Sequence, residues 1–504
     1  YCVAVAALGS HPEVLSAWGS VLPFDPSILA GALLAPDLGG YPIASQLAAT
    51  PALAAYSGAM LSSLLGCLIS FVLPTSLGSL ESHEVGGFMR GILWGIVAMP
   101  AALAVLSHRG QLAELYDAFA IVMPLLSSFA SQTCDMRLLP SYEQTKRAMH
   151  RGMKPREWGL LSRLCRELFQ ACGNPLFSEV YARFNRYSHL PFFFTCDDSP
   201  LRAQMDWHGD FFTALENRNI QEKYNWLTAS YLRTADAVRM SLNLLEAEYR
   251  GVVLPPAEPF QWGGLYGYDP IYIQIAQDLI AKINTGVYPL EQYLPHEAEL
   301  AKAYGVSLTT VRKALVELRR LGYCRTLNVK GSIAQRCSIE TVCRTVRNPT
   351  RKRDAMRYLY GLQFMALLAG PAARLAAPRF TAEEKAALAA QFKRPDAIPL
   401  ILLVECIGRH LDPEPLRAIF LETEHLVRWG YCTLLHESRS ERVRRVTHKS
   451  RAAFDALLAE DMETFSLEMA DYYRSSFQMV RTQYIQYYRL SEAEAVMAPP
   501  LGLL

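Results

Sequence analysis

Hydrophobic positions follow a helical period through most of the chain beyond residue 108. Apolar side chains recur there every three or four positions, which is typical of helices that bury one face. Gly173, Asn174 and Pro175 interrupt the pattern as a helix stop followed by a proline at a new start. The pattern predicts helices over Leu112–Ala130, Glu157–Cys172, Pro175–Tyr187, Met205–Asn217 and Asn219–Ala247, and again throughout residues 354–490.

A shorter pattern occupies residues 265–335 and predicts three helices followed by a hairpin. The first helix has an apolar stripe formed by Ile271, Ile275, Leu279 and Ile283. A second helix is predicted over His296–Tyr304, and Ser307 caps a third because its hydroxyl can accept from an early free N–H. The third helix is expected to bury Val311, Leu315 and Leu318. Tyr323–Ile333 then has the pattern of a short hairpin.

The chain before residue 109 is apolar and rich in small residues. No residue between Gly39 and Leu80, or between Gly91 and Ser107, is charged. Ala54–Leu73 is long enough to span the hydrocarbon of a bilayer, and Gly91–Ser107 is a shorter uncharged stretch. We interpret residues 50–108 as a membrane anchor, the alternative being a pair of buried helices in a soluble core.

These patterns predict a mainly α protein, in which a winged helix-turn-helix with a small β-wing lies between two all-helical bundle domains, preceded by apolar transmembrane helices. Residues 251–264 contain Pro-Pro and Gly-Gly pairs and are expected to be a linker. The expected divisions are 1–108, 109–250, 251–264, 265–335 and 354–490.

The two helical regions have the features of an internal repeat. Three segment pairs can be aligned, starting at Leu115 and Leu362, at Asn174 and Glu414, and at Phe212 and Phe454. Their offsets in residue number are 247, 240 and 242. A nearly constant offset favours a duplicated domain over three chance matches.

Composition excludes several classes of protein. A net charge of +2 does not by itself predict a polyanionic partner. The eleven cysteines include no Cys-x-x-Cys pair, which indicates reduced thiols in a cytoplasmic protein and neither disulfides nor a zinc site. No nucleophile arrangement, glycine-rich phosphate loop or paired-carboxylate motif occurs, so we expect no catalytic residue, no cofactor and no enzymatic activity.

The third helix of residues 265–335 carries the side chains of a DNA-reading helix. The helical pattern leaves outside the residues Thr309, Thr310, Arg312, Lys313, Glu317, Arg319 and Arg320. Hydroxyls near the N-terminus, with positive charge one turn later, suit a helix whose first turn enters the major groove. Lys330 and Gly331 fall where the tip of a wing would touch the DNA backbone. The expected partner is a double-stranded DNA operator.

These residues resemble the GntR family of bacterial regulators. The motifs "LP-x-E-x-EL" and "GVS-x-TTVR-x-AL-x-x-L", the following "GY" and a wing glycine occur in order and at the right spacings. The resemblance implies DNA contacts by Thr309, Thr310, Arg312, Lys330 and Gly331. Where the family usually has two DNA-contacting arginines, this chain has Ala298 and Leu308. Their loss is expected to weaken affinity, and an alternative is a winged helix kept as a dimerisation module.

Both helical regions resemble the effector domains of GntR regulators, which implies a small-molecule metabolite effector and a homodimer. Many such domains hold a metal through one Asp and three His. The corresponding positions here are Leu161, Cys165, His208 and Ser230, with Ser450 and Tyr472 at the last two places in the second copy. One imidazole cannot build a metal site, so no metal is expected, and His208 is only a weak ligand-binding candidate.

The first hundred residues resemble the ethanolamine-utilisation membrane permeases. The matching run is Asp25–Ala48, and its most specific piece is "DLGGYP", Asp37–Pro42. The resemblance covers too few spans for a transporter, so transport is not expected. The chain starts at Tyr1 without a signal peptide, which we interpret as the interior of a longer or fused frame. Open alternatives are an anchored regulator, a permease with an incidental soluble half, and two neighbouring genes joined as one.

Overall fold

The computed structural model forms two compact units, one of residues 1–107 and 249–257, the other of residues 108–248 and 258–504. The structure describes residues 27, 48, 51–54, 57, 85, 87–88, 102–151, 158–189, 191, 200, 209–252, 254, 256–260, 262, 270–284, 286–327, 331–335, 337, 349–394, 399–428 and 439–500. In the first unit the described residues include the short helix α5, Pro51–Ala54. Of the two stretches expected to span a membrane, the first lies outside the described residues except for Ala54 and Ser57, and the second is described only over residues 102–107, which are helical.

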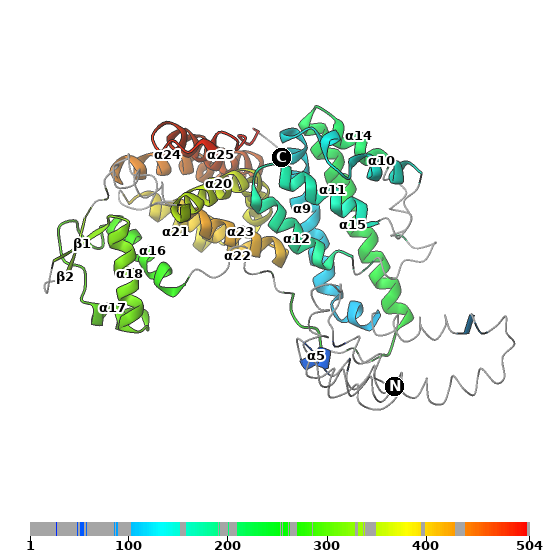
Figure 1. The fold of residues 1–504 in the computed structure, drawn as a ribbon, viewed down its shortest axis with the longest axis horizontal. Helices are drawn as coiled ribbons and strands as arrows, with labels where there is room; N and C mark the ends of the chain where they lie inside the picture. The colour runs from blue at the N-terminus through cyan, green and yellow to red at the C-terminus, as the bar shows by residue number, and fades with distance from the viewer. Residues whose placement is uncertain are drawn as a thin grey trace. The chain divides into compact units, whose positions relative to one another are not determined.

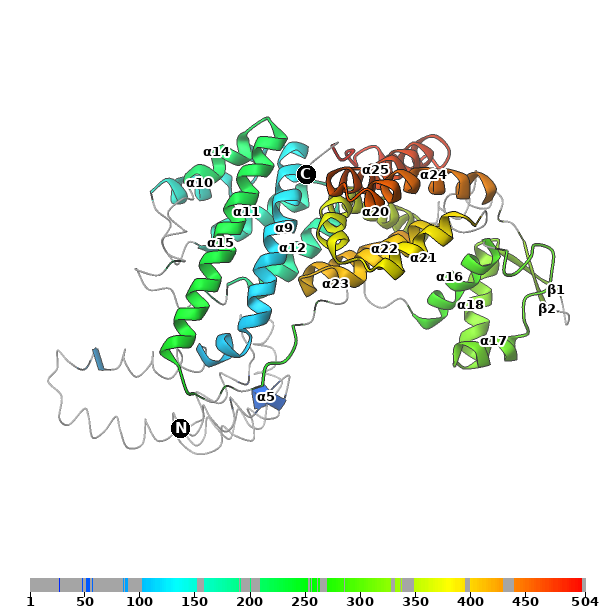
Figure 2. The ribbon, with the colours of Figure 1, turned by 180° about the vertical axis from the view of Figure 1, so that it is seen from behind.

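Most of the second unit is helical (Figures 1 and 2). What we call the first bundle comprises α9 Arg109–Thr133, η4 Met136–Leu138, α10 Tyr142–His150, α11 Trp158–Ala171, α12 Pro175–Tyr187, α14 Gly209–Glu216 and α15 Ile220–Glu248. Its centre is formed by α9, which packs against α15, α11 and α12. The five helices predicted for this region are all present, with ends shifted by a few residues at most.

The start of α12 shows why the sequence breaks there. Gly173 adopts a φ of +78°, which favours glycine. The Asn174 side chain accepts a hydrogen bond from the Leu176 N–H at 2.9 Å, and Pro175 occupies the first helical position, where a missing N–H has no cost. These three residues therefore end one helix and begin the next, as predicted.

The second bundle comprises α20 Pro349–Ala376, η8 Ala377–Arg379, α21 Ala382–Phe392, α22 Pro399–His410, α23 Glu414–Arg428, α24 Arg439–Leu458, α25 Met462–Gln486 and η10 Ser491–Ala493. Its long helices α20 and α25 pack against each other, and α20 also contacts α22 and α23. The pairing of α20 with α25 matches that of α9 with α15 in the first bundle.

The two bundles repeat the same elements in the same order. The offset that aligns Phe212 with Phe454 also places the first residue of α15 on the first residue of α25. It brings the start of η4 next to the start of η8, and the end of α9 next to the end of α20. By this offset Leu115 falls on Arg357, five residues before Leu362, so the alignment of Leu115 with Leu362 is out of register by more than one helical turn.

Helix α9 is the one described helix that is long and apolar enough to cross a membrane. Most of this helix is buried inside the structure. Leu115, Val122 and Phe129 are almost fully buried between neighbouring helices. These contacts are those of a core helix.

Residues 271–334 form a three-helix unit with a two-stranded wing. Its elements are α16 Ile271–Asn284, α17 Glu297–Tyr304, α18 Leu308–Arg320, β1 Cys324–Leu327 and β2 Gly331–Ala334. β1 and β2 are antiparallel, with Cys324 opposite Ala334 and Leu327 opposite Gly331. On α16, Ile275, Leu279 and Ile283 are buried as predicted, but Ile271 is 57% exposed because it starts the helix, beyond the reach of the neighbouring helices.

Part of the predicted linker packs on the first bundle. The Phe260 ring stacks on Tyr187 with centroids 4.1 Å apart, and Trp262 is buried beside Phe184. Arg183 donates a hydrogen bond to the Trp262 carbonyl. The aromatic residues of "PFQW" therefore attach this segment to α12, although its prolines and glycines predict only a linker.

Candidate nucleic-acid interface

Helix α18 begins with a tight turn and a serine cap. Gly305 ends α17 with a φ of +64°. Ser307 then accepts a hydrogen bond from the Thr310 N–H at 3.2 Å, and the two hydroxyl oxygens lie 2.9 Å apart. The cap leaves the exposed Thr309 at the start of the helix, where free backbone N–H groups attract an anion such as a phosphate.

One face of α18 is buried and the opposite face is basic. Val311, Ala314 and Leu318 are fully buried, and α18 packs against α16 and α17. The exposed side chains of α18 include Thr309, Arg312, Lys313, Arg319 and Arg320, with Thr310 half-buried. The helical pattern in the sequence therefore predicted correctly that these six side chains lie on or at the edge of the outer face.

Glu317 is an exception to the predicted outer face. Its side chain is buried, and its carboxylate lies 3.1 Å from Nε of Arg320. The residue follows the buried face because it is next to Leu318, and pairing with Arg320 offsets the cost of burying its charge. The expectation that Glu317 points outward is wrong.

Arg312 is held by a carboxylate of the preceding helix. Its Nε lies 2.7 Å from Oε2 of Glu297, the first residue of α17. Both side chains are substantially exposed. The arginine is thereby fixed at the surface where the two helices meet.

A third extended segment completes the wing. Tyr293 forms a bridge to Ile333, and the Leu294 N–H donates to the Ser332 carbonyl at 2.8 Å. Gly331 has a φ of +109°, and a Cβ atom there would lie 3.5 Å from the Tyr293 ring. Gly331 is therefore required by the backbone of the wing, and Lys330 lies outside the described residues.

The wing carries a basic residue that the motifs do not single out. Arg325 of β1 is exposed and lies 2.7 Å from Glu291. Cys324 is the buried residue of β1, and Arg325, Thr326 and Leu327 are all exposed, so burial along this strand does not alternate. The resemblance to the family implies contacts only at the tip of the wing, whereas the exposure of Arg325 in the structure adds this position.

The positions of the two missing arginines face outward. Ala298 on α17 is exposed, and Leu308, at the first position of α18, is 44% exposed. Both positions are therefore at the surface of the winged helix, where a longer side chain would reach solvent.

A polar cluster fixes α16 against α17. Tyr304 donates a hydrogen bond to Asp278, and Lys282 lies 2.6 Å from the same carboxylate. Burial, together with the hydrogen bond to Asp278, raises the pKa of Tyr304 to about 12. The contacts of Asp278 with Tyr304 and Lys282 hold α16 and α17 together, and α18 packs against both helices.

The positions considered for a metal in the helical bundles hold other side chains. Cys165 is buried, and burial raises the pKa of its thiol to about 12. Ser230 is buried with its hydroxyl unpaired, while Ser450 donates to the Val446 carbonyl at 2.7 Å. Leu161 and Tyr472 are half-buried, and His208 lies outside the described residues. Among the residues that the structure describes, no group of three His, Cys, Asp or Glu side chains converges as a metal site.

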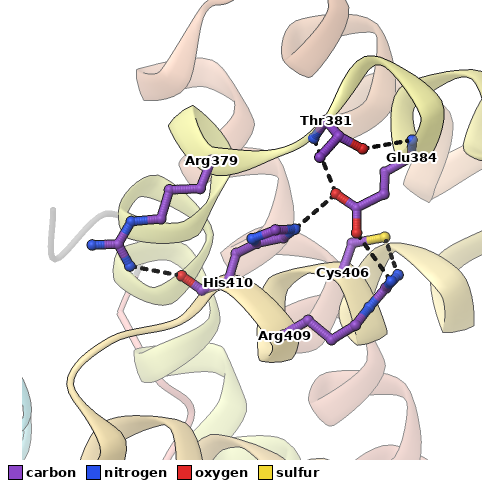
Figure 3. Close-up of polar contacts among 6 residues, drawn as sticks. All are labelled: Arg379, Thr381, Glu384, Cys406, Arg409 and His410. Carbon is purple, nitrogen blue, oxygen red and sulfur yellow. Dashed lines mark hydrogen bonds and ion pairs between the residues drawn. The ribbon is translucent and has the colours of Figure 1, made fainter.

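A histidine in the second bundle belongs to a different cluster (Figure 3). The Glu384 carboxylate receives the Thr381 N–H, lies 2.7 Å from Nε2 of His410 and pairs with Arg409 at 3.0 Å. Partial burial opposes ionisation of Glu384, but the Thr381 N–H, His410 and Arg409 outweigh it and hold its pKa below the usual value. With these partners the carboxylate fastens α21 to α22.

Two parts of the chain match known families. Residues 271–332 match the family described as "Bacterial regulatory proteins, gntR family", and residues 2–128 match "Ethanolamine utilisation protein, EutH". Residues 271–332 are a GntR-type winged-helix domain, as the sequence motifs indicate. The N-terminal match confirms the resemblance to the permeases.

Individual relatives fall into the same two groups. The chain is 38% identical over 76 residues to "Probable ethanolamine permease EutH" of Listeria monocytogenes, which is 15% of this chain and 20% of the relative. It is 42% identical over 62 residues to "HTH-type transcriptional regulator TreR" of Bacillus subtilis, which is 12% of this chain and 26% of the relative. The chain thus spans about a fifth to a quarter of the length of these relatives. A solved structure, Escherichia coli McbR/YncC, aligns with 43% of this chain and all of its own at 17% identity and a TM-score of 0.23.

Proposed function

We propose that this chain is a DNA-binding transcription regulator of the GntR type, in which helical bundles sense a small metabolite. The observation that carries the proposal is the outer face of α18, where hydroxyl and basic side chains surround a capped helix N-terminus. The match of residues 271–332 to the GntR family, and similarity to named regulators over the same region, support it. A binding protein of this kind needs no catalytic centre.

The N-terminal turn of α18 enters the major groove in this proposal. Thr309 and Thr310 contact phosphates or base edges, Arg312 bridges a guanine edge or a phosphate, and Lys313 contacts the backbone. Lys330 and Gly331 contact the DNA backbone from the wing. In this proposal Arg312 exchanges Glu297 for DNA, so the carboxylate of Glu297 competes with DNA for this side chain.

The effector in this proposal is a small polar metabolite bound inside a bundle. Support comes from the first bundle, where the buried hydroxyls of Ser128 and Ser230 have no hydrogen-bond partner. A buried polar group without a partner is costly, and a ligand that supplies one gains affinity. Binding would shift the balance between two arrangements of the bundles and so change operator affinity. In this mechanism effector-like bundles pair with each other. The sequence analysis expects this pairing in a homodimer.

A second candidate function concerns the N-terminal part. Residues 2–128 match the permease family, which favours a permease fragment fused to the regulator. The fragment would anchor a cytoplasmic DNA-binding part at the membrane. Fractionation tests the anchor: the full chain would sediment with membranes and leave them only on addition of detergent, whereas release by salt or carbonate would contradict it.

Selection of DNA from a random duplex pool tests the proposed function. The full chain, kept in detergent, is expected to enrich one sequence family over several rounds. Arg312→Ala should lose the enrichment, because the bidentate contact is removed. Arg166→Ala, which removes an exposed arginine of α11, should retain it. Equal enrichment, or none, by all three proteins would contradict the proposal.

A further inference from the structure

The two bundles are equivalent helix by helix. Helix α9 corresponds to α20 and α12 corresponds to α23, each as the first and the fourth α-helix of its bundle as described. The offset that superimposes the starts of α15 and α25 also brings the start of α12 within one turn of the start of α23. Any surface that one bundle offers for pairing is therefore also present, in altered sequence, on the other.

The contacts between the bundles are reciprocal. Helix α9 of the first bundle contacts α23 of the second, and α12 of the first contacts α20 of the second. Each of these contacts becomes the other when the two bundles are exchanged. Helices α9 and α20, which correspond to each other, also touch. This is the pattern of an isologous interface, in which the same patch on two equal partners meets itself across a two-fold axis.

The interface between the two bundles is packed and buried like a protein interior. The Phe177 and Phe364 rings meet edge to face with centroids 5.7 Å apart. Asn174 and Gln363 are fully buried, and Nδ2 of Asn174 donates to Oε1 of Gln363 at 2.7 Å and to the Tyr360 carbonyl at 3.1 Å. Gln363 in turn donates to the Met497 carbonyl at 2.7 Å. Buried amides satisfied in this way fix one relative position of the two bundles.

An ion pair lies at corresponding places on the two equivalent helices. Arg183 of α12 and Glu422 of α23 are joined at 3.2 Å, and both are mostly buried. Arg183 follows the start of α12 by eight residues, and Glu422 follows the start of α23 by eight residues. By the offset that superimposes α15 and α25 the counterpart of Arg183 is His425, which lies within one turn of Glu422 on α23, so the ion pair lies close to the two-fold axis.

We infer that the second bundle occupies the face of the first bundle on which a second copy of the chain would otherwise dock. The pairing expected between two chains is thus made within one chain. An isologous patch that is filled by its own equivalent has no free surface for a further copy. One consequence of the inference rests on the proposed function. The described residues contain one winged helix for the two bundles that pair, so each chain would read a single half-site of DNA.

Zero-length cross-linking of the full chain tests the pairing. Arg183→Lys places an amine beside Glu422, and a carbodiimide would join the two as an amide. The expected result is that the 183–422 cross-linked peptide is recovered from the band of one chain on a denaturing gel. Two native ion pairs serve as controls within single bundles, Lys146–Glu216 and Lys449–Asp471, each at 2.9 Å.

Two outcomes of the cross-linking experiment would overturn the inference. Recovery of the 183–422 peptide only from a two-chain band would overturn the inference, because the bundles would then pair between chains. Its absence while both control peptides form would also overturn it, since the controls show that each bundle is folded. In the wild-type protein the guanidinium of Arg183 does not form an amide with Glu422, so any 183–422 signal there is background.

DNA stoichiometry provides the second readout. Adding an inverted second copy of the selected half-site should change affinity by only about two-fold, whereas two linked reading heads would gain on the order of 100-fold. A gain of that size would contradict the reading of one half-site per chain. If no sequence is selected at all, the proposed function fails, while the cross-link still decides the pairing.

Discussion

Nε of Arg312 lies 2.7 Å from Oε2 of Glu297, which joins the second turn of α18 to the first residue of α17. Because the two side chains are 63% and 42% exposed, the pair contributes little to stability. The ion pair instead positions the guanidinium of Arg312, which it holds at the surface that faces DNA in the proposed function. The same carboxylate competes with DNA for the arginine.

Removal of the competing charge is expected to strengthen DNA binding. Glu297→Gln should lower the dissociation constant by about 2- to 5-fold, because an exposed pair of this kind is worth up to about 1 kcal/mol. Fluorescence anisotropy with the selected duplex measures it. Glu299→Gln is the matched control, since Glu299 accepts the His296 N–H in a capping box and does not contact Arg312. Weaker binding by Glu297→Gln would show that the pair orders Arg312 for DNA.

The two missing arginines can be restored. Ala298→Arg and Leu308→Arg should each strengthen binding and steepen its salt dependence, by close to one unit of slope for each additional phosphate that the protein neutralises. Both positions are exposed, so neither change needs repacking. Leu244→Arg on α15, where the side chain is 60% exposed, adds the same charge outside the winged helix. An equal increase in affinity from all three variants would mean that net charge alone is responsible.

The buried amide at the interface of the bundles should be sensitive to loss of its donors. Asn174→Asp keeps the oxygen that caps α12 but removes Nδ2 and its bonds to Gln363 and Tyr360. We expect a loss of about 2 to 5 kcal/mol in unfolding free energy, measured by urea denaturation, because a carboxylate is left facing two acceptors. Asn219→Asp makes the same change at the exposed start of α15, where Nδ2 donates only to the exposed Glu222 at 2.9 Å, and should have a much smaller effect. A small loss at Asn174 would contradict the satisfied interior interface.

Much of the fold could be predicted from the sequence. The period of 3.6 located the helices, and at α12 the stop, cap and proline fixed both ends of the break, because Gly173, Asn174 and Pro175 each act locally. The outer face of α18 followed from the same period. What could not be predicted depends on partners distant in sequence: capture of Arg312 by Glu297, attachment of Trp262 to α12, and pairing of Asn174 with Gln363. A local pattern contains no information about which distant element meets it.

A buried lysine predicts a pH-dependent stability. Lys223 is 2% exposed in α15, where the equivalent helix of the second bundle places Phe465, and Nζ donates to Ser131 Oγ at 2.5 Å. Burial lowers its pKa to about 8. In the folded state the lysine therefore loses its proton before the unfolded chain does, so stability is reduced below pH 8 and recovers as the pH rises toward the pKa of an unfolded lysine.

Lys223→Met should remove this dependence. The variant is expected to be more stable than the wild type by up to about 3 kcal/mol at pH 7, with the difference shrinking above pH 8. Urea denaturation across this range measures it. Lys393→Met, at an exposed position, should give a small difference that does not vary with pH in this way. A Lys223→Met protein that is less stable at pH 7 would indicate that the ammonium is compensated in the fold.

Site-selective DNA binding by α18 is the central claim, and a salt titration tests it most directly. The full chain in detergent would be titrated by fluorescence anisotropy against the DNA upstream of its own gene and against a shuffled duplex, at two salt concentrations, with Arg312→Ala beside it. We expect preference for the upstream DNA, a steep loss of affinity with salt, and a loss of about 1 to 3 kcal/mol in the variant. Equal affinity for both duplexes, or binding unaffected by Arg312→Ala, would contradict the account and favour a winged helix that serves only to pair proteins.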